Sequence, residues 1–183
     1  MDKGKKMKLK SIISALLIAA LALSLVGCGS PVGKTVEHKN DEIGLAYTLP
    51  ESMKYYPYGS AANEYIYRNT AGNSVCIITY HKDTALSGIA ALEGDLSLEN
   101  YVEYALEDIG ITGQVQVVYN SAKTRASFEV ATAESENEEP QYSYNLIIRG
   151  DEGIYIVQML CLADDSAVYS EEYKQLAKKI YTY

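Results

Sequence analysis

The chain has 183 residues, and its 24 acidic and 16 basic side chains give a formal net charge of −8. This balance repels nucleic acid, and beyond residue 10 no polybasic segment is present that would hold the chain to a membrane by charge. The length suits one domain with a single core.

The N-terminal segment predicts a secretion signal. Residues 1–10 carry five lysines and one aspartate, and residues 12–26 are apolar apart from Ser14 and Ser24. As a helix this run would reach roughly 22 Å, which is short of the ~30 Å hydrocarbon core of a membrane. A basic start, a short apolar run and small residues at its end are typical of a cleaved signal peptide, and an uncleaved signal-anchor helix is the alternative.

The apolar run ends in Leu25-Val26-Gly27-Cys28. This motif resembles the bacterial lipobox, in which a small residue precedes an invariant cysteine. The resemblance implies diacylglyceryl transfer to Cys28 and cleavage after Gly27, and two acyl chains suffice for stable anchoring. We therefore expect a signal peptide over residues 1–27, a lipidated cysteine with a flexible tether over 28–40, and one domain over 41–183 outside the cell membrane.

Processing would make the protein more acidic. Five of the basic residues and one of the acidic residues lie within residues 1–27, so the remaining 156 residues carry a formal net charge of −12. This composition indicates an acidic domain that lipid alone holds near the membrane, with no nucleic-acid partner.

The first half of the domain predicts short strands. Residues 35–39 are a candidate edge strand, and residues 44–50 alternate Leu45, Tyr47 and Leu49 on one face before Pro50 ends the strand. Residues 64–68 and 74–80 predict a hairpin around a glycine-bearing loop. Both faces of 74–80 are apolar, which indicates a central strand covered on both sides. Residues 84–96 predict a loop, or a loop with one helical turn.

A helix follows over residues 97–109, with Ser97 as its N-cap and Gly110 after its end. Residues 114–120 and 125–132 predict a second hairpin. The acidic run at 134–140 is a solvated loop, because it lacks the spacing and the turn glycine of a calcium loop.

The last part of the chain predicts two long strands and a helix. In residues 141–149, the alternation sends one set of side chains inward (Tyr142, Tyr144, Leu146, Ile148) and another outward (Gln141, Ser143, Asn145, Arg149). Residues 154–162 are apolar on both faces apart from Gln158, which predicts a second central strand. Ser170 is the expected N-cap of a closing helix over 171–180, whose apolar stripe is Tyr173, Leu176, Ala177 and Ile180.

Strands joined by hairpin turns, with a mid-chain helix and a C-terminal helix, predict a mainly antiparallel α+β fold with one helix on each side of the sheet. The order resembles the PsbP-like (Mog-type) fold: a glycine, an aromatic-bearing strand ending at Pro50, hairpins, the mid-chain helix, two further hairpins and a closing Tyr-Ser-Glu-Glu-Tyr helix over residues 41–183. The resemblance implies an α/β/α sandwich and a non-catalytic binding or assembly role. No binding residue carries over from the family.

Tyrosine dominates the aromatic composition, with 17 tyrosines, one phenylalanine and no tryptophan. The predicted binding surface is a group in the first half of the domain: Tyr55, Tyr56, Tyr58, Tyr65 and Tyr67. The alternative is that these rings only cover the edge of the sheet, since tyrosine supplies apolar area with a hydroxyl that needs water or a partner.

The cysteines and histidines predict no catalytic or metal centre. Cys76 and Cys161 lie in apolar strand patterns, which favours two buried free thiols, with a disulfide between neighbouring strands as the alternative. Only His38 and His81 could serve as imidazole bases, and no G-x-S-x-G elbow, phosphate loop or Cys/His metal spacing occurs. We expect no cofactor and no metal.

Three functions remain open at this point. The first is a lipid-anchored, non-enzymatic domain that binds or helps assemble another envelope protein. The second is a lipoprotein that binds a small ligand or a glycan with the tyrosine group. The third is a hydrolase, which requires clustered carboxylates in a cleft with raised pKa values.

Overall fold

The computed structural model describes residues 33–57, 62–69, 74–87, 96–108, 111, 114–132 and 139–183. Cys28 and the whole predicted signal peptide lie outside these residues, so both remain predictions. Among the residues described, no helix is long and apolar enough to cross a membrane.

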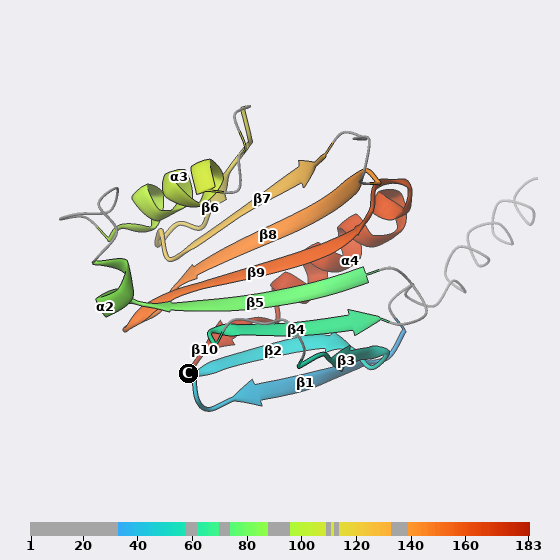
Figure 1. Cartoon of the computed structure of the whole chain (residues 1–183), viewed down its shortest axis with the longest axis horizontal. Helices are drawn as coiled ribbons and strands as arrows, with labels where there is room; N and C mark the ends of the chain where they lie inside the picture. The colour runs from blue at the N-terminus through green and yellow to red at the C-terminus, as the bar shows by residue number, and fades with distance from the viewer. Residues whose placement is uncertain are drawn as a thin grey trace, which may run out of the picture.

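The centre of the fold is a seven-stranded antiparallel sheet (Figure 1). Its strands, in spatial order, are β3 (Met53–Tyr55), β4 (Glu64–Asn69), β5 (Ser74–Lys82), β9 (Gly153–Leu162), β8 (Gln141–Arg149), β7 (Arg125–Ala131) and β6 (Val118–Tyr119). The two predicted central strands are confirmed, because β5 and β9 pair side by side in the middle of the sheet. The hairpin predicted at 114–132 also forms, but its first strand is only two residues long.

A second, three-stranded sheet has the order β1 (Thr35–Asn40), β2 (Leu45–Pro50) and β10 (Tyr181–Thr182). The strand predicted at 44–50 is confirmed as β2, with Leu45, Tyr47 and Leu49 all buried. The candidate edge strand at 35–39 is confirmed as β1, which pairs along the whole length of β2, so these residues belong to the sheet. The chain pattern did not predict β10, whose two residues pair with Leu45 and Ala46.

The helices cover opposite faces of the large sheet, as expected. These are α2 (Asp83–Leu86), α3 (Leu98–Asp108) and α4 (Ser166–Ala177). The helix predicted at 97–109 is confirmed as α3, and the Ser97 hydroxyl accepts a hydrogen bond from the Asn100 amide at 3.3 Å. α3 packs on β7 and β8 from one side, and α4 packs on β8, β9 and β2 from the other.

The closing helix begins earlier than the sequence predicted. Ser170 is not its N-cap, because α4 begins at Ser166 after a short 3-10 turn over Ala163–Asp165. The added turn lets the Tyr169 ring stack on the Tyr173 ring at 5.6 Å, which extends the packed face of the helix. The predicted apolar residues Tyr173, Leu176, Ala177 and Ile180 are at most 3% exposed, but α4 ends at Ala177, so Ile180 is buried beyond the end of the helix.

The core has two parts, one on each face of the large sheet. The larger cluster lies between the sheet, β2 and α4, and the smaller one lies under α2 and α3. Cys76 and Cys161 both belong to the larger cluster and are free thiols, which confirms the favoured prediction. Burial raises the pKa of the Cys76 thiol to about 12.

A half-buried cation joins the two ends of the fold. The Arg125 guanidinium, at the start of β7, donates hydrogen bonds to the carbonyl oxygens of Ile180 (2.6 Å) and Ala177 (2.7 Å). These carbonyls lie at the C-terminal end of α4, where backbone oxygens lack helical partners and favour a positive charge. Arg125 therefore fixes the position of α4 on the sheet.

Candidate functional site

A groove at the β3–β4–β5 end of the large sheet is the candidate site. Its volume is about 650 Å³, and its lining includes Lys54, Tyr55, Tyr56, Arg68, Val75 and Leu162. Tyr55 is 51% exposed and Tyr56 is 37% exposed. The groove is lined by residues of β3, β4, β5 and β9, by the residue after β3 and by Glu139 before β8, and the antiparallel register brings Lys54, Arg68 and Val75 into one row.

Local interactions hold the aromatic side of the groove. The Tyr56 amide donates to the Ile66 carbonyl at 2.8 Å, which continues the β3–β4 ladder by one residue. The Arg68 guanidinium lies 4.4 Å from the centre of the Tyr56 ring, a cation–π contact. The Lys54 ammonium donates to the Glu51 carbonyl at 2.8 Å. The groove thus presents two cations beside two accessible rings.

The predicted tyrosine surface is split by the sheet. Tyr55 and Tyr56 line the groove, whereas Tyr58 lies outside the described residues. Tyr65 and Tyr67 lie on the face of the sheet opposite Lys54 and Arg68, where Tyr65 packs against the larger core cluster and donates a hydrogen bond to Glu42 at 3.1 Å. Tyr55 pairs with Tyr67 and its ring contacts the Tyr67 ring, so Tyr55 reaches the groove from the edge of the sheet. Of the four tyrosines of this group that the structure describes, Tyr55 and Tyr56 line the groove.

Tyr67 has a structural role. Its hydroxyl oxygen lies 2.5 Å from that of Tyr47, and these residues are 7% and 3% exposed. The Tyr67 ring also contacts Tyr55 and His38 at centroid distances of 5.6 Å, and His38 stacks on Tyr47 at 5.4 Å. Burial raises the pKa of both paired hydroxyls. This ring cluster joins β1 and β2 to β4.

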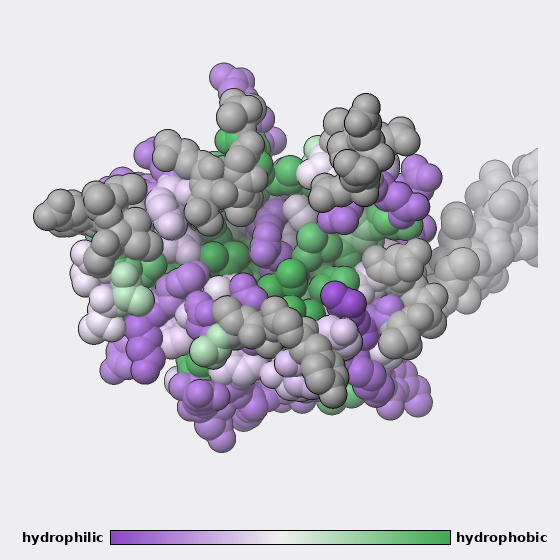
Figure 2. All heavy atoms as spheres, viewed as in Figure 1, coloured by the Kyte–Doolittle hydropathy of each residue, from purple (hydrophilic) through white to green (hydrophobic). Residues whose placement is uncertain are grey.

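The face of the sheet that carries α3 is only partly covered. α3 packs over β7 and β8, and the side chains on the same face of β4, β5 and β9 remain partly accessible: Ile66, Val75, Ile77, Leu160 and Leu162. Figure 2 shows hydrophobic atoms gathered in a hollow at the centre of this face. The prediction that the central strands are covered on both sides is thus met fully on the α4 face and only in part on this one.

Sequence alternation placed Asn145 outward, but the structure buries it to 1% exposure, which corrects that prediction. Its amide donates to the Ser143 hydroxyl at 3.0 Å and accepts from the Gln158 amide at 3.1 Å. Asn145 borders a small cavity of about 100 Å³ under α3, together with His81 and Tyr101. The alternating pattern could not reveal this burial, because it depends on α3 packing over that face.

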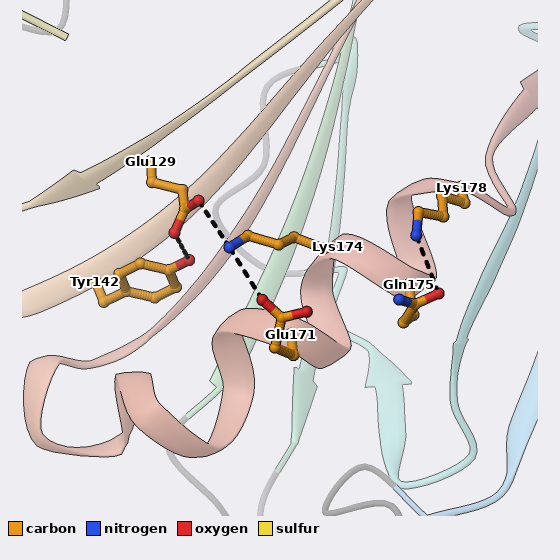
Figure 3. A network of polar contacts seen from close by, with 6 residues as sticks. All are labelled: Glu129, Tyr142, Glu171, Lys174, Gln175 and Lys178. Carbon is orange, nitrogen blue, oxygen red and sulfur yellow. Dashed lines mark hydrogen bonds and ion pairs between the residues drawn. The ribbon is translucent and has the colours of Figure 1, made fainter. Parts of the chain in front are cut away.

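The other side of β7 is joined to α4 by a charged network (Figure 3). Lys174 lies between Glu129 at 3.0 Å and Glu171 at 3.2 Å, and the Tyr142 hydroxyl donates to Glu129 at 2.7 Å. Burial tends to raise the pKa of Glu129, but the hydrogen bonds from Tyr142 and Lys174 bring it below its ordinary value. These contacts hold the helix in place.

The described residues offer little for acid–base or metal chemistry. No group of three or more His, Cys, Asp or Glu side chains in this part of the chain could hold a metal ion. The hydrogen bond from Arg149 lowers the pKa of Asp83, so both described carboxyl groups with a shifted pKa are shifted down. A hydrolase acid needs a shift in the other direction. Burial and the charge of Lys54 lower the pKa of His38, which is part of the ring cluster.

No protein-family model matches this sequence, and no curated protein matches it in sequence. Solved structures match its fold. The Saccharomyces cerevisiae Ran-binding protein Mog1p has a TM-score of 0.57 at 11% identity, covering 81% of this chain and 95% of that one. The cyanobacterial PsbP (CyanoP) of Synechocystis sp. PCC 6803 has a TM-score of 0.57 at 10% identity, covering 86% and 98%.

A third match is a protein from Bacteroides thetaiotaomicron VPI-5482, with a TM-score of 0.53 at 9% identity. It covers 82% of this chain, which spans about half (48%) of the longer Bacteroides chain. The chain therefore has the mainly antiparallel α+β fold of the PsbP/Mog type, as the order of elements predicted. Likeness at these identities establishes the fold alone.

Proposed function

We propose that this protein is a lipid-anchored, non-enzymatic domain on the outer side of the cell membrane, and that it binds or helps assemble another envelope protein. The anchor is inferred from the lipobox motif at Cys28. The observation that carries the binding role is the partly uncovered apolar face of β4, β5 and β9. Contiguous accessible apolar surface of this kind favours association, since its burial releases about 25 cal/mol per Å².

The fold supports this proposal in two further ways. Neither of the two described carboxyl groups with a shifted pKa, Asp83 and Glu129, has the raised pKa that a hydrolase acid requires. One of the solved structures with this fold is a Ran-binding protein, which is an example of protein binding by a domain of this architecture. The partner proposed here is an envelope protein with an apolar docking surface.

The docking face is tested by adding a charge to it. Ile77→Asp places a carboxylate in the middle of the open face, and Val168→Asp places one on α4, where Val168 is 50% exposed. After chemical cross-linking of membranes, we expect wild type and Val168→Asp to retain the same partner and Ile77→Asp to lose it. Thermal unfolding shows whether Ile77→Asp is folded. Retention of the partner by a folded Ile77→Asp variant would contradict the proposal.

The anchor has its own test. Cells labelled with radioactive palmitate should transfer label to the wild-type protein and none to a Cys28→Ala variant. Globomycin, which blocks cleavage of lipidated signals, should cause a larger precursor to accumulate. An unlabelled product with an intact amino terminus would remove the lipid anchor from the proposal.

A small ligand or a glycan is the second candidate, favoured by the rings of Tyr55 and Tyr56 in the 650 Å³ groove. Sugars stack on such rings, and Tyr56→Ala should then weaken binding to an array of bacterial envelope glycans. The separation of Tyr65 and Tyr67 from this groove leaves a smaller aromatic platform than the sequence predicted.

A further inference from the structure

The tether enters the domain beside the groove. The Glu51 amide donates to the Lys34 carbonyl at 2.7 Å, and Thr35 pairs with Pro50. β3 begins three residues after Pro50 and forms the border of the groove. The end of the domain that receives the tether is therefore the end that carries Tyr55, Tyr56 and the two cations.

The tether is short. Six residues, 29–34, separate Cys28 from β1, and a fully extended chain spans at most about 3.6 Å per residue, or roughly 22 Å in total. The acyl chains on Cys28 would thus keep Lys34 within that distance of the bilayer. The turn that joins β8 to β9, with Asp151 and Glu152, lies at the other end of the strands.

The cations of the groove have unused hydrogen-bond donors. Within the described part of the chain, no ion pair involves Lys34, Lys54 or Arg68. Arg68 contacts the Tyr56 ring by its face, which leaves its five N–H donors available, and Lys54 uses one of three on a backbone carbonyl. Glu139 also lines the groove, so its lining combines two cations with one carboxylate in a protein that is strongly acidic as a whole.

We propose that this groove binds the phosphate headgroup of an anionic lipid in the membrane to which the protein is tethered. Arg68 provides a planar fork of donors that matches phosphate oxygens, and Lys54 adds a second positive charge. Tyr55 and Tyr56 are amphipathic rings of the kind that favour the headgroup level of a bilayer. This inference rests on the proposed lipid anchor.

The test uses the mature lipidated protein in vesicles of phosphatidylcholine, alone or with an equal amount of phosphatidylglycerol. A fluorophore on Ser52→Cys, an exposed position of the β2–β3 turn, reports quenching by a spin label on lipid headgroups. Native Cys76 and Cys161 are buried and should not react. Lys54→Gln/Arg68→Gln removes the groove cations, and Lys178→Gln/Lys179→Gln removes two exposed cations after α4 as the matched control.

We expect phosphatidylglycerol to increase the quenching at position 52 of the wild type and of the control pair. A cation near an anionic membrane contributes about fivefold to binding, so the groove pair should lower the ratio of docked to free domain about thirtyfold. Equal losses for both pairs, or no loss for the groove pair, would overturn the proposal. Binding of soluble glycerol phosphate by a wild-type protein whose quenching does not respond to phosphatidylglycerol would overturn the lipid source of the phosphate.

Failure of the anchor gives a different result. In that case the wild-type protein would not float with vesicles of phosphatidylcholine alone, whereas failure of the groove alone leaves a protein that floats with both vesicles but whose label is insensitive to phosphatidylglycerol. Tyr56→Ala provides a second variant, which should reduce the quenching without changing the charge. An unchanged Tyr56→Ala signal would remove the ring from the proposed site.

Discussion

The hydroxyl pair of Tyr47 and Tyr67 allows a sharp test of whether Tyr67 is structural. In Tyr67→Phe, the Tyr47 hydroxyl loses its 2.5 Å partner while remaining in a residue that is 3% exposed. Leaving a buried polar group without a partner costs about 1–3 kcal/mol. Tyr47→Phe should cost a similar amount, since it leaves the Tyr67 hydroxyl in the same position.

The double variant separates this explanation from simple loss of contacts. Replacing both partners by apolar groups of the same shape is nearly neutral, so Tyr47→Phe/Tyr67→Phe should be less destabilised than either single variant. Urea unfolding followed by circular dichroism measures all three free energies. A double variant that loses as much as the sum of the single variants would refute the reasoning.

The same pair predicts a response to alkaline pH. Burial raises the pKa of both hydroxyls above the unfolded value of about 10. Above that pH the unfolded chain binds fewer protons than the folded chain, so stability falls as pH rises. The stabilisation is fully present below about pH 10 and is lost as pH rises through the folded values. The double variant should therefore lose less stability than the wild type between neutral and alkaline pH.

Three other predictions concern the packing. Arg125→Met removes two charge-assisted hydrogen bonds to α4 and should lower the free energy of unfolding by about 2–4 kcal/mol, and an unchanged urea midpoint would show that Arg125 does not hold the helix. Gly153→Ala would place a Cβ atom 2.3 Å from the His81 carbonyl oxygen. It should therefore lower the free energy of unfolding by about 1–3 kcal/mol in the same assay, and an unchanged urea midpoint would show that β5 and β9 move apart at no cost. The thiols of Cys76 and Cys161 should resist Ellman's reagent at pH 8 and react in urea, and rapid reaction of the native protein would mean that they are accessible.

The strand and helix patterns were predicted well where one local period describes a face of the element. Leu45, Tyr47 and Leu49 alternate along β2, and all three are buried. In α3 the predicted Ser97 cap agrees with the structure because it depends on neighbours within one helical turn. Local chemistry is sufficient for such features.

The predictions failed where a distant segment decides the environment. Asn145 alternates as an outward residue, but α3 covers it and Gln158 supplies its partner from the neighbouring strand. The true start of α4 depends on the stacking of Tyr169 on Tyr173 against the core.

The sequence by itself determined the expected order of strands and helices, the two central strands and the favoured buried thiols, because periodicity and turn residues act over a few positions. The PsbP/Mog-type architecture was implied by the resemblance of that order to a known family. Only the tertiary structure decided that Tyr55 and Tyr56 share a groove with Arg68 while Tyr65 and Tyr67 lie behind the sheet. The physical reason is that neighbours across a sheet are set by the register between strands, and an accessible surface is set by which helix covers which strands.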